Sequence, residues 1–191
     1  MAPRYWKPIQ TGVEQDDDSA AVQRLSGCRS DDVLAEGVRL RHPVSPHRAA
    51  ELAGTAIDVE ALVEMARSRC GASPWIVEGA GGVLVPLTTE RFIIDLMAAL
   101  GLPALIVARS SLGTINHTLL TMEALGRRGV RVAGIVLVGP PHAENRTAIE
   151  RYGRGSVVGE LPLLDPLGPE TLWPWADRAL DGDNRLLEFL Q

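Results

Sequence analysis

Any chemistry that requires a lysine side chain must use a single residue of this sequence, Lys7. Lys7 is the only lysine in 191 residues, and it lies between Trp6 and Pro8 in an otherwise apolar stretch. Burying an ammonium group without a partner is costly, so its side chain should face solvent, a carboxylate or an anionic ligand. The sequence around Lys7 leaves these three surroundings open. Thr11 and Gly12 follow at a predicted turn, which by itself explains both residue types.

Carboxylates occur at two further places where they can meet a charged ligand. Asp16, Asp17 and Asp18 precede a predicted helix, where acids cap the first turn and complement the helix dipole. The same three acids can also contribute to a site for a hard cation such as magnesium. Glu78 follows a predicted buried strand and opens the string Glu-Gly-Ala-Gly-Gly. Such a string is often only a turn, but it also lets backbone approach a phosphate beside a metal-binding acid.

A polar segment at 110–114 precedes a third candidate position, the start of a helix that carries Asn116 and His117. Free N–H groups at a helix start can hold a carboxylate or a phosphate. Ordinary N-capping by Ser or Thr explains the segment equally well. Ser45-Pro46-His47-Arg48 likewise either caps a helix or presents cations to a substrate.

The elements that must position these residues alternate between short apolar runs and amphipathic stretches. Predicted strands cover Tyr5–Ile9, Val38–Leu40, Trp75–Val77, Ala104–Ala108, Val132–Val138 and Val157–Val158. Predicted helices cover about Asp18–Leu25, Pro46–Leu52, Asp58–Arg69, Arg91–Leu100, Ile115–Arg127, Glu144–Tyr152 and the tail from Pro169. This alternation predicts an α/β fold, a mostly parallel sheet with helices on both faces. Ligands bind such sheets beyond the carboxyl ends of the strands, where the polar segments fall. We therefore expect Lys7, Glu78 and the segment 111–116 to converge at one edge of the sheet.

Composition excludes several classes of protein. A chain of 191 residues with 46% hydrophobic residues predicts a single domain over residues 1–191 with a substantial core, and excludes a disordered chain. A net charge of −5 without a basic block argues against nucleic acid as a partner. Cys28, Cys70 and the four histidines lack the spacing of a disulfide framework or a zinc site. The sequence starts without an apolar leader, and its longest apolar run, 92–108, is interrupted by Asp95, Gly101 and Pro103. We therefore expect a cytoplasmic protein without membrane partners.

Five strings together resemble the ATP-dependent dethiobiotin synthetases, over nearly the whole chain. They are WKPIQTG (6–12), SPHRAAE (45–51), VEGAGGVLVPL (77–87), SLGTINHTLLTMEAL (111–125) and GELP (159–162). The resemblance implies a P-loop-NTPase-like fold, a homodimer, and closure of the ureido ring of dethiobiotin from 7,8-diaminopelargonate and CO2. It also implies ATP as co-substrate, Mg2+ as cofactor, and a carbamate that ATP phosphorylates.

The resemblance also implies roles for individual residues. Lys7 matches the catalytic lysine, and Asp18 and Glu78 match magnesium- and nucleotide-binding carboxylates, with Asp16 and Asp17 as alternatives to Asp18. Substrate binding is implied for Thr11, Leu112, Gly113 and Asn116. Nucleotide binding is implied for Gly79, Ala80, Gly81, Leu161, Pro162 and Leu163.

Two features depart from the family. The sequence contains no G-x-x-x-x-G-K-[ST] motif, so we expect the family's first strand and glycine-rich phosphate loop to be missing from this chain. Three explanations remain open: a start assigned too late or a trimmed record, a non-catalytic remnant or binding module, or a loop supplied by a separate polypeptide. Val138-Gly139 also replaces an asparagine that contacts adenine in some members.

Overall fold

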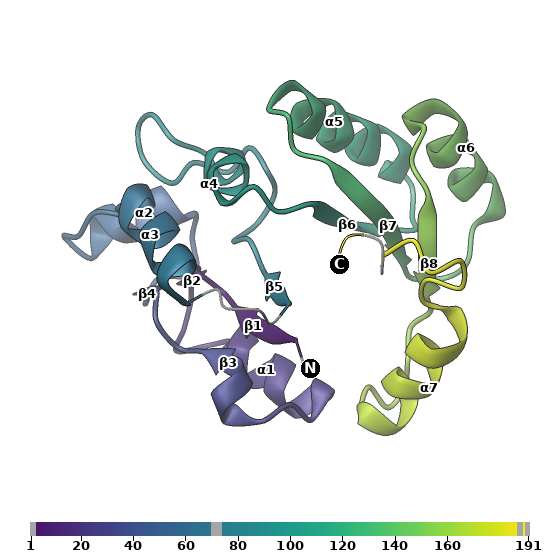
Figure 1. Cartoon of the computed structure of the whole chain (residues 1–191), viewed down its shortest axis with the longest axis horizontal. Helices are drawn as coiled ribbons and strands as arrows, with labels where there is room; N and C mark the ends of the chain where they lie inside the picture. The colour runs from purple at the N-terminus through teal and green to yellow at the C-terminus, as the bar shows by residue number, and fades with distance from the viewer. Residues whose placement is uncertain (1–2, 70–73, 187–188, 190–191) are drawn as a thin grey trace. The chain divides into compact units, whose positions relative to one another are not determined.

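The structure is a computed structural model that describes residues 3–69, 74–186 and 189, and the chain divides into two compact units, Met1–Leu100 and Gly101–Gln191. Within each unit, the strands β1 to β8 pair with one another in parallel, and helices follow the strands along the chain (Figure 1). The predicted α/β organisation with parallel pairing is therefore confirmed. Cys70 lies outside the described residues.

Two small sheets organise the first unit. In one sheet, β1 (Arg4–Trp6) lies between β3 (Val33–Leu34) and β5 (Trp75–Val77). In the other, β2 (Ile9–Thr11) pairs with β4 (Val38–Leu40). The remaining elements are α1 (Asp18–Ser26), a 3-10 turn (Ser30–Asp32), α2 (Pro46–Leu52), α3 (Val59–Arg69) and α4 (Ile93–Leu100).

The prediction of one continuous strand over Tyr5–Ile9 is wrong, because the chain leaves the first sheet at Lys7-Pro8 and enters the second at Ile9. Proline has no N–H to donate to a ladder, so the β1 pairing cannot run through it. The Pro8 carbonyl instead accepts a hydrogen bond of 2.8 Å from the N–H of Val38. The sheet therefore breaks beside Lys7, the candidate catalytic residue.

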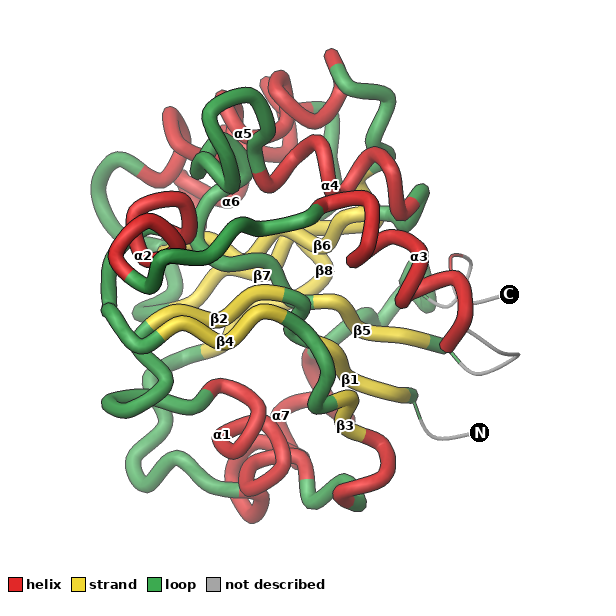
Figure 2. The backbone as a smooth tube through the Cα atoms, turned by 90° about the vertical axis from the view of Figure 1, so that its left-hand side faces the viewer, coloured by secondary structure: helices red, strands yellow, loops and turns green. Residues whose placement is uncertain are grey.

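Opposite faces of β1 have opposite character. Trp6 is 1% exposed and packs into an apolar cluster, whose helical members come from α2, α3 and α4. Tyr5 and Lys7 flank Trp6 and therefore point to the other face, as alternate residues of a strand do. Figure 2 shows α1 across the strands from α3 and α4. One short strand thus supports the core with one face and a polar cluster with the other.

The second unit has one three-stranded sheet in the order β6-β7-β8, formed by β6 (Ala104–Arg109), β7 (Val132–Val138) and β8 (Val157–Leu161). The helices are α5 (Thr114–Arg127) and α6 (Ala143–Gly153) on one side and α7 (Pro169–Ala179) on the other (Figure 1). β8 is longer than the predicted pair Val157–Val158. The tail is not helical throughout, because α7 ends at Ala179.

One edge strand in each unit, β5 in the first and β6 in the second, exposes apolar side chains. On β6, Leu105 is 45% and Val107 is 67% exposed, although Ile106 between them is buried. On β5, Ile76 is 56% exposed. Parallel sheets are usually covered on both faces. These two edge strands differ, because each leaves apolar side chains exposed on one face. Within the described residues, no helix combines the length and apolar character that crossing a bilayer requires.

Candidate active site

The Lys7 side chain lies at the carboxyl end of β1, where the sheet breaks. The side chain is 7% exposed, so its ammonium group is withdrawn from solvent. Arg39 on β4 donates a hydrogen bond of 2.8 Å from Nη1 to the Lys7 carbonyl oxygen. Gly37 passes so close that a Cβ there would lie 2.5 Å from the Pro8 carbonyl oxygen. The backbone of Lys7-Pro8 is thus held from the β4 side.

Glu78 reaches Lys7 because β5 lies beside β1 in parallel. The register pairs Trp6 with Val77, and the N–H of Glu78 donates to the Trp6 carbonyl oxygen at 2.9 Å. Glu78 therefore leaves the sheet beside Lys7, and its Oε1 accepts a hydrogen bond of 2.8 Å from Lys7 Nζ. The expectation that Lys7 and Glu78 lie at the same edge of the sheet is confirmed.

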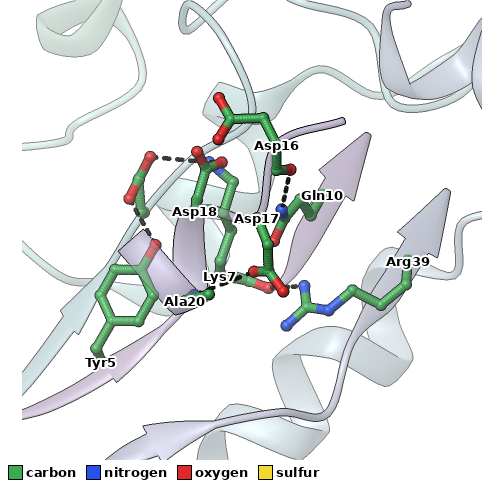
Figure 3. Close-up of polar contacts among 9 residues, drawn as sticks. Tyr5, Lys7, Gln10, Asp16, Asp17, Asp18, Ala20 and Arg39 are labelled. Carbon is green, nitrogen blue, oxygen red and sulfur yellow. Dashed lines mark hydrogen bonds and ion pairs between the residues drawn. The ribbon is translucent and has the colours of Figure 1, made fainter. Parts of the chain in front are cut away.

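Asp16, Asp17 and Asp18, at the start of α1, have different roles (Figure 3). Asp17 is the N-cap, and its side chain accepts from the N–H of Ala20 at 3.2 Å. Asp18 forms an ion pair with Lys7. The backbone carbonyl of Asp16 accepts a hydrogen bond of 2.9 Å from Gln10 Nε2, while its side chain is exposed. Only Asp18 of the three therefore meets the lysine.

Lys7 is kept charged by its two carboxylate partners. Burial by itself lowers the pKa of Lys7, but hydrogen bonds and attraction from Asp18 and Glu78 outweigh it and raise the pKa above its usual value. Lys7 is therefore a permanent ammonium ion between two carboxylates at neutral pH. This surrounding is one of the three that the sequence left open.

The cluster has the donor set that a magnesium site needs. Two carboxylates from separate elements converge on one cationic atom, so their oxygens can neutralise a cation between them. Magnesium in nucleotide sites is bound by one or two carboxylates together with phosphates and water. In the described part of the chain, no group of three or more His, Cys, Asp or Glu side chains is placed to hold a metal ion by itself. Asp18 and Glu78 thus fit the magnesium of a nucleotide-dependent enzyme.

Sequence reasoning missed two residues of this cluster, Tyr5 and Arg39. Tyr5 donates a hydrogen bond of 2.6 Å from its hydroxyl to Glu78 Oε2, the oxygen that Lys7 does not use. The signal for Tyr5 was its position two residues before Lys7 on the same strand, which places both on one face. Arg39 offered a weaker signal, an arginine in the middle of a short apolar strand.

The remaining predicted residues of the first unit lie in the adjoining loops. Gly79, Ala80 and Gly81 follow Glu78 as a turn, in which Gly81 has a φ of +80° that favours glycine. Thr11 ends β2 and is half-buried beside its partner Leu40. These positions are close in sequence to the cluster, but their predicted ligand contacts stay predictions.

The other predicted residues belong to the second unit. Gly113, with a φ of +92°, is the N-cap of α5 and makes no side-chain cap hydrogen bond. Capping by Ser or Thr is therefore not what the structure shows at this helix start. Leu112 is 99% exposed, and Asn116 is exposed on the first turn. Leu161 ends β8, Pro162 is half-buried, and Leu163 is 76% exposed. The predicted convergence of segment 111–116 with Lys7 and Glu78 stays a prediction.

Comparison with known proteins decides the family. The model of the AAA domain family matches residues 1–171. An ATP-dependent dethiobiotin synthetase of Nitrobacter hamburgensis is 46% identical over 168 residues, which cover 88% of this chain and 77% of that protein. The chain belongs to the ATP-dependent dethiobiotin synthetase family.

Other family members extend the same relationship. The synthetase of Bradyrhizobium diazoefficiens is 43% identical over 172 residues, or 90% of this chain and 80% of that protein. The synthetase of Brucella ovis is 44% identical over 172 residues, or 90% and 79% of the two chains. The resemblance to dethiobiotin synthetases inferred from the five strings is confirmed, and with it the P-loop-NTPase-like α/β fold.

Proposed function

We propose that this chain is an ATP- and magnesium-dependent dethiobiotin synthetase that closes the ureido ring of 7,8-diaminopelargonate with CO2. The observation that carries the proposal is the buried Lys7 ammonium between Asp18 and Glu78, in a chain of this family. A fixed positive charge in a partly desolvated site can stabilise negative charge that develops during a reaction.

In the proposed reaction, one amine nitrogen of the substrate attacks CO2 and loses a proton, which gives a carbamate. A carbamate oxygen then takes the γ-phosphoryl group, and ADP leaves. The second amine attacks the activated carbonyl carbon, phosphate leaves, and the ring closes. Lys7 stabilises the carbamate and the phosphoryl charge through Nζ. Thr11 offers its hydroxyl to the substrate.

The nucleotide and the metal have distinct proposed sites. Asp18 and Glu78 hold the magnesium ion, which when bound neutralises charge on the phosphates. Gly79, Ala80 and Gly81 line the nucleotide, and Leu161, Pro162 and Leu163 border the adenine. Because the 191 residues contain no G-x-x-x-x-G-K-[ST] motif, we expect full nucleotide affinity only when an upstream segment or a separate polypeptide supplies a phosphate loop.

A homodimer completes the proposal, and we place it in the cytoplasm. Leu112, 99% exposed before α5, and Leu120, 55% exposed on α5, support a subunit interface there. The uncapped start of α5 supports binding of the substrate carboxylate by Leu112, Gly113 and Asn116, because backbone N–H groups at a helix start attract anions. Light scattering on the purified chain tests the dimer.

The direct test is product formation. We expect dethiobiotin, measured by mass spectrometry, to require diaminopelargonate, bicarbonate as the CO2 source, ATP and magnesium. The assay uses the 191-residue chain beside a form extended upstream by a strand and phosphate loop. Lys7→Met in the active form should lower kcat by about 10²–10³-fold, as loss of a transition-state charge contact does. Wild-type turnover by Lys7→Met, or no product from either form, would contradict the proposal. An extended form that binds ATP without making product would favour the binding-module alternative.

A further inference from the structure

We propose that Tyr5 is a positioning residue that holds the Glu78 carboxylate in a one-oxygen orientation, and so makes the site select Mg2+ over Ca2+. The proposal rests on the proposed function, in which Glu78 binds the metal. It adds a residue that neither the family resemblance nor the predicted site contained.

The geometry divides the two oxygens of Glu78 between two donors. The Tyr5 hydroxyl donates to Oε2 at 2.6 Å, and Lys7 Nζ donates to Oε1 at 2.8 Å. The two donors flank Trp6, the last residue of β1, whose side chain anchors this part of the chain in the core. The carboxylate is therefore fixed in its rotation as well as in its place.

Lys7 marks the position of positive charge, because its ammonium also pairs with Asp18. The oxygen of Glu78 that faces this charge is Oε1. Oε2 lies on the other side, against a hydroxyl on a ring that is only 6% exposed overall. A cation that takes the place of the ammonium between the carboxylates meets Oε1 first.

This division matters because the two common divalent cations use carboxylates differently. Mg2+ demands a compact octahedral shell and takes few carboxylate oxygens, whereas Ca2+ accepts bidentate carboxylates in a larger shell. Bidentate binding by Glu78 requires the carboxylate to turn and the Tyr5 hydrogen bond to break. The hydroxyl therefore penalises Ca2+ and leaves one-oxygen binding of Mg2+ undisturbed.

The Tyr5 hydroxyl is the donor in its contact with Glu78, because a carboxylate oxygen can only accept. The hydrogen bond to a carboxylate is also of the stronger, charge-assisted kind.

The test compares cation affinities of four proteins by titration calorimetry, with Mg2+ or Ca2+ added alone and again with a non-hydrolysable ATP analogue. The proteins are the wild type, Tyr5→Phe, Glu78→Gln and Tyr152→Phe. Tyr152 is the matched control, because it is the other tyrosine of the chain and is 67% exposed on α6. We expect Tyr5→Phe to lower the Mg2+/Ca2+ affinity ratio by about tenfold, the low end for an outer-shell partner of a metal ligand. Tyr152→Phe should keep the wild-type ratio, and Glu78→Gln should weaken the binding of both cations.

The outcomes separate the two proposals. An unchanged ratio in Tyr5→Phe, with weakened binding in Glu78→Gln, overturns the role of Tyr5 and leaves the proposed function standing. Unchanged binding in Glu78→Gln, or binding of neither cation by the form extended upstream with a strand and phosphate loop, overturns both.

A second measurement covers the case in which Tyr5→Phe does not fold. In the Tyr152→Phe protein labelled with 13Cζ-tyrosine, Tyr5 gives the only tyrosine signal. That signal should shift when Mg2+ replaces the ammonium at Glu78, because the carboxylate becomes a weaker acceptor. A signal that does not move when Mg2+ binds overturns the proposal.

Discussion

Arg39 donates a hydrogen bond of 2.8 Å from Nη1 to the carbonyl oxygen of Lys7, the residue that follows β1. Its Nη2 donates to the Ala35 carbonyl oxygen at 3.2 Å, so one guanidinium joins two segments of backbone. The lysine side chain is held by carboxylates, and its backbone is held by this arginine. The position of the Nζ atom therefore depends on a residue that does not touch it.

Arg39→Met should misplace Lys7 while leaving Lys7, Asp18 and Glu78 themselves unchanged. We expect a loss of about 1–2 kcal/mol in the free energy of unfolding, typical of hydrogen bonds from a charged donor. We also expect a fall in kcat that exceeds any change in KM. Arg41→Met is the control, since its side chain is 72% exposed and pairs with the exposed Glu14. Equal effects of the two substitutions, in urea unfolding and in steady-state kinetics, would show that Arg39 has no positioning role.

Substitutions of Asp16, Asp17 and Asp18 should have different effects on the magnesium requirement and on helix stability. Asp18→Asn should raise the magnesium concentration needed for half-maximal activity, because it removes a carboxylate that pairs with Lys7. Asp17→Asn should leave that concentration unchanged and lower helix stability by at most about 1 kcal/mol, because Asn is also a good N-cap. Asp16→Asn should change neither, since only its backbone is engaged. A magnesium effect at Asp16 rather than Asp18 would move the metal site along the loop.

Lys7 should remain charged to unusually high pH. Its raised pKa means that its contribution to stability is fully present below the pKa of the unfolded chain, near 10.4, and is lost as pH rises through the higher folded value. Because Lys7 is the only lysine, 13Cε-lysine NMR reports its titration without assignment. The difference in unfolding free energy between wild type and Lys7→Met should stay constant from pH 6 to about pH 10. A midpoint below the usual lysine value would contradict the ion-paired arrangement.

Gly37 should tolerate no side chain. Its φ is +144°, and an added Cβ would lie 2.5 Å from the Pro8 carbonyl oxygen. Gly37→Ala should therefore destabilise the protein by about 2–4 kcal/mol, through backbone strain and a contact with backbone that cannot move away cheaply. Gly126→Ala is the control, because nothing lies within 4 Å of its Cβ position on α5. That control should be neutral or stabilising by about 0.5 kcal/mol in thermal unfolding.

The meeting of Lys7 and Glu78 was predictable because each residue directly follows a strand of one parallel sheet. Glu78 was expected beside Lys7 because parallel strands end at the same edge of a sheet, and the β1–β5 pairing places it there. The choice among the aspartates was not predictable, because N-capping and ion pairing both favour acids at these positions. Local backbone geometry makes that choice, with Asp17 as the cap and Asp18 facing the lysine.

The break of the first strand was predictable and was overlooked. Pro8 lies inside the run Tyr5–Ile9, and a proline argues against a continuous inner strand. An arginine in the middle of a short apolar strand was a weak signal for Arg39. Its partner could not have been predicted, because that partner is a backbone carbonyl 32 residues away in the sequence.

The double role of β1 restricts how this part of the chain can change in length. Trp6 fills the apolar cluster, while Tyr5 and Lys7 serve the carboxylates on the other face. Inserting or deleting one residue before Lys7 reverses the faces of every position that follows within the strand. The ammonium would then enter the apolar cluster, and the indole would leave it. A one-residue insertion or deletion in this strand therefore disrupts both the packing of Trp6 and the carboxylate contacts of Tyr5 and Lys7. A change of two residues would keep each side chain on its own face.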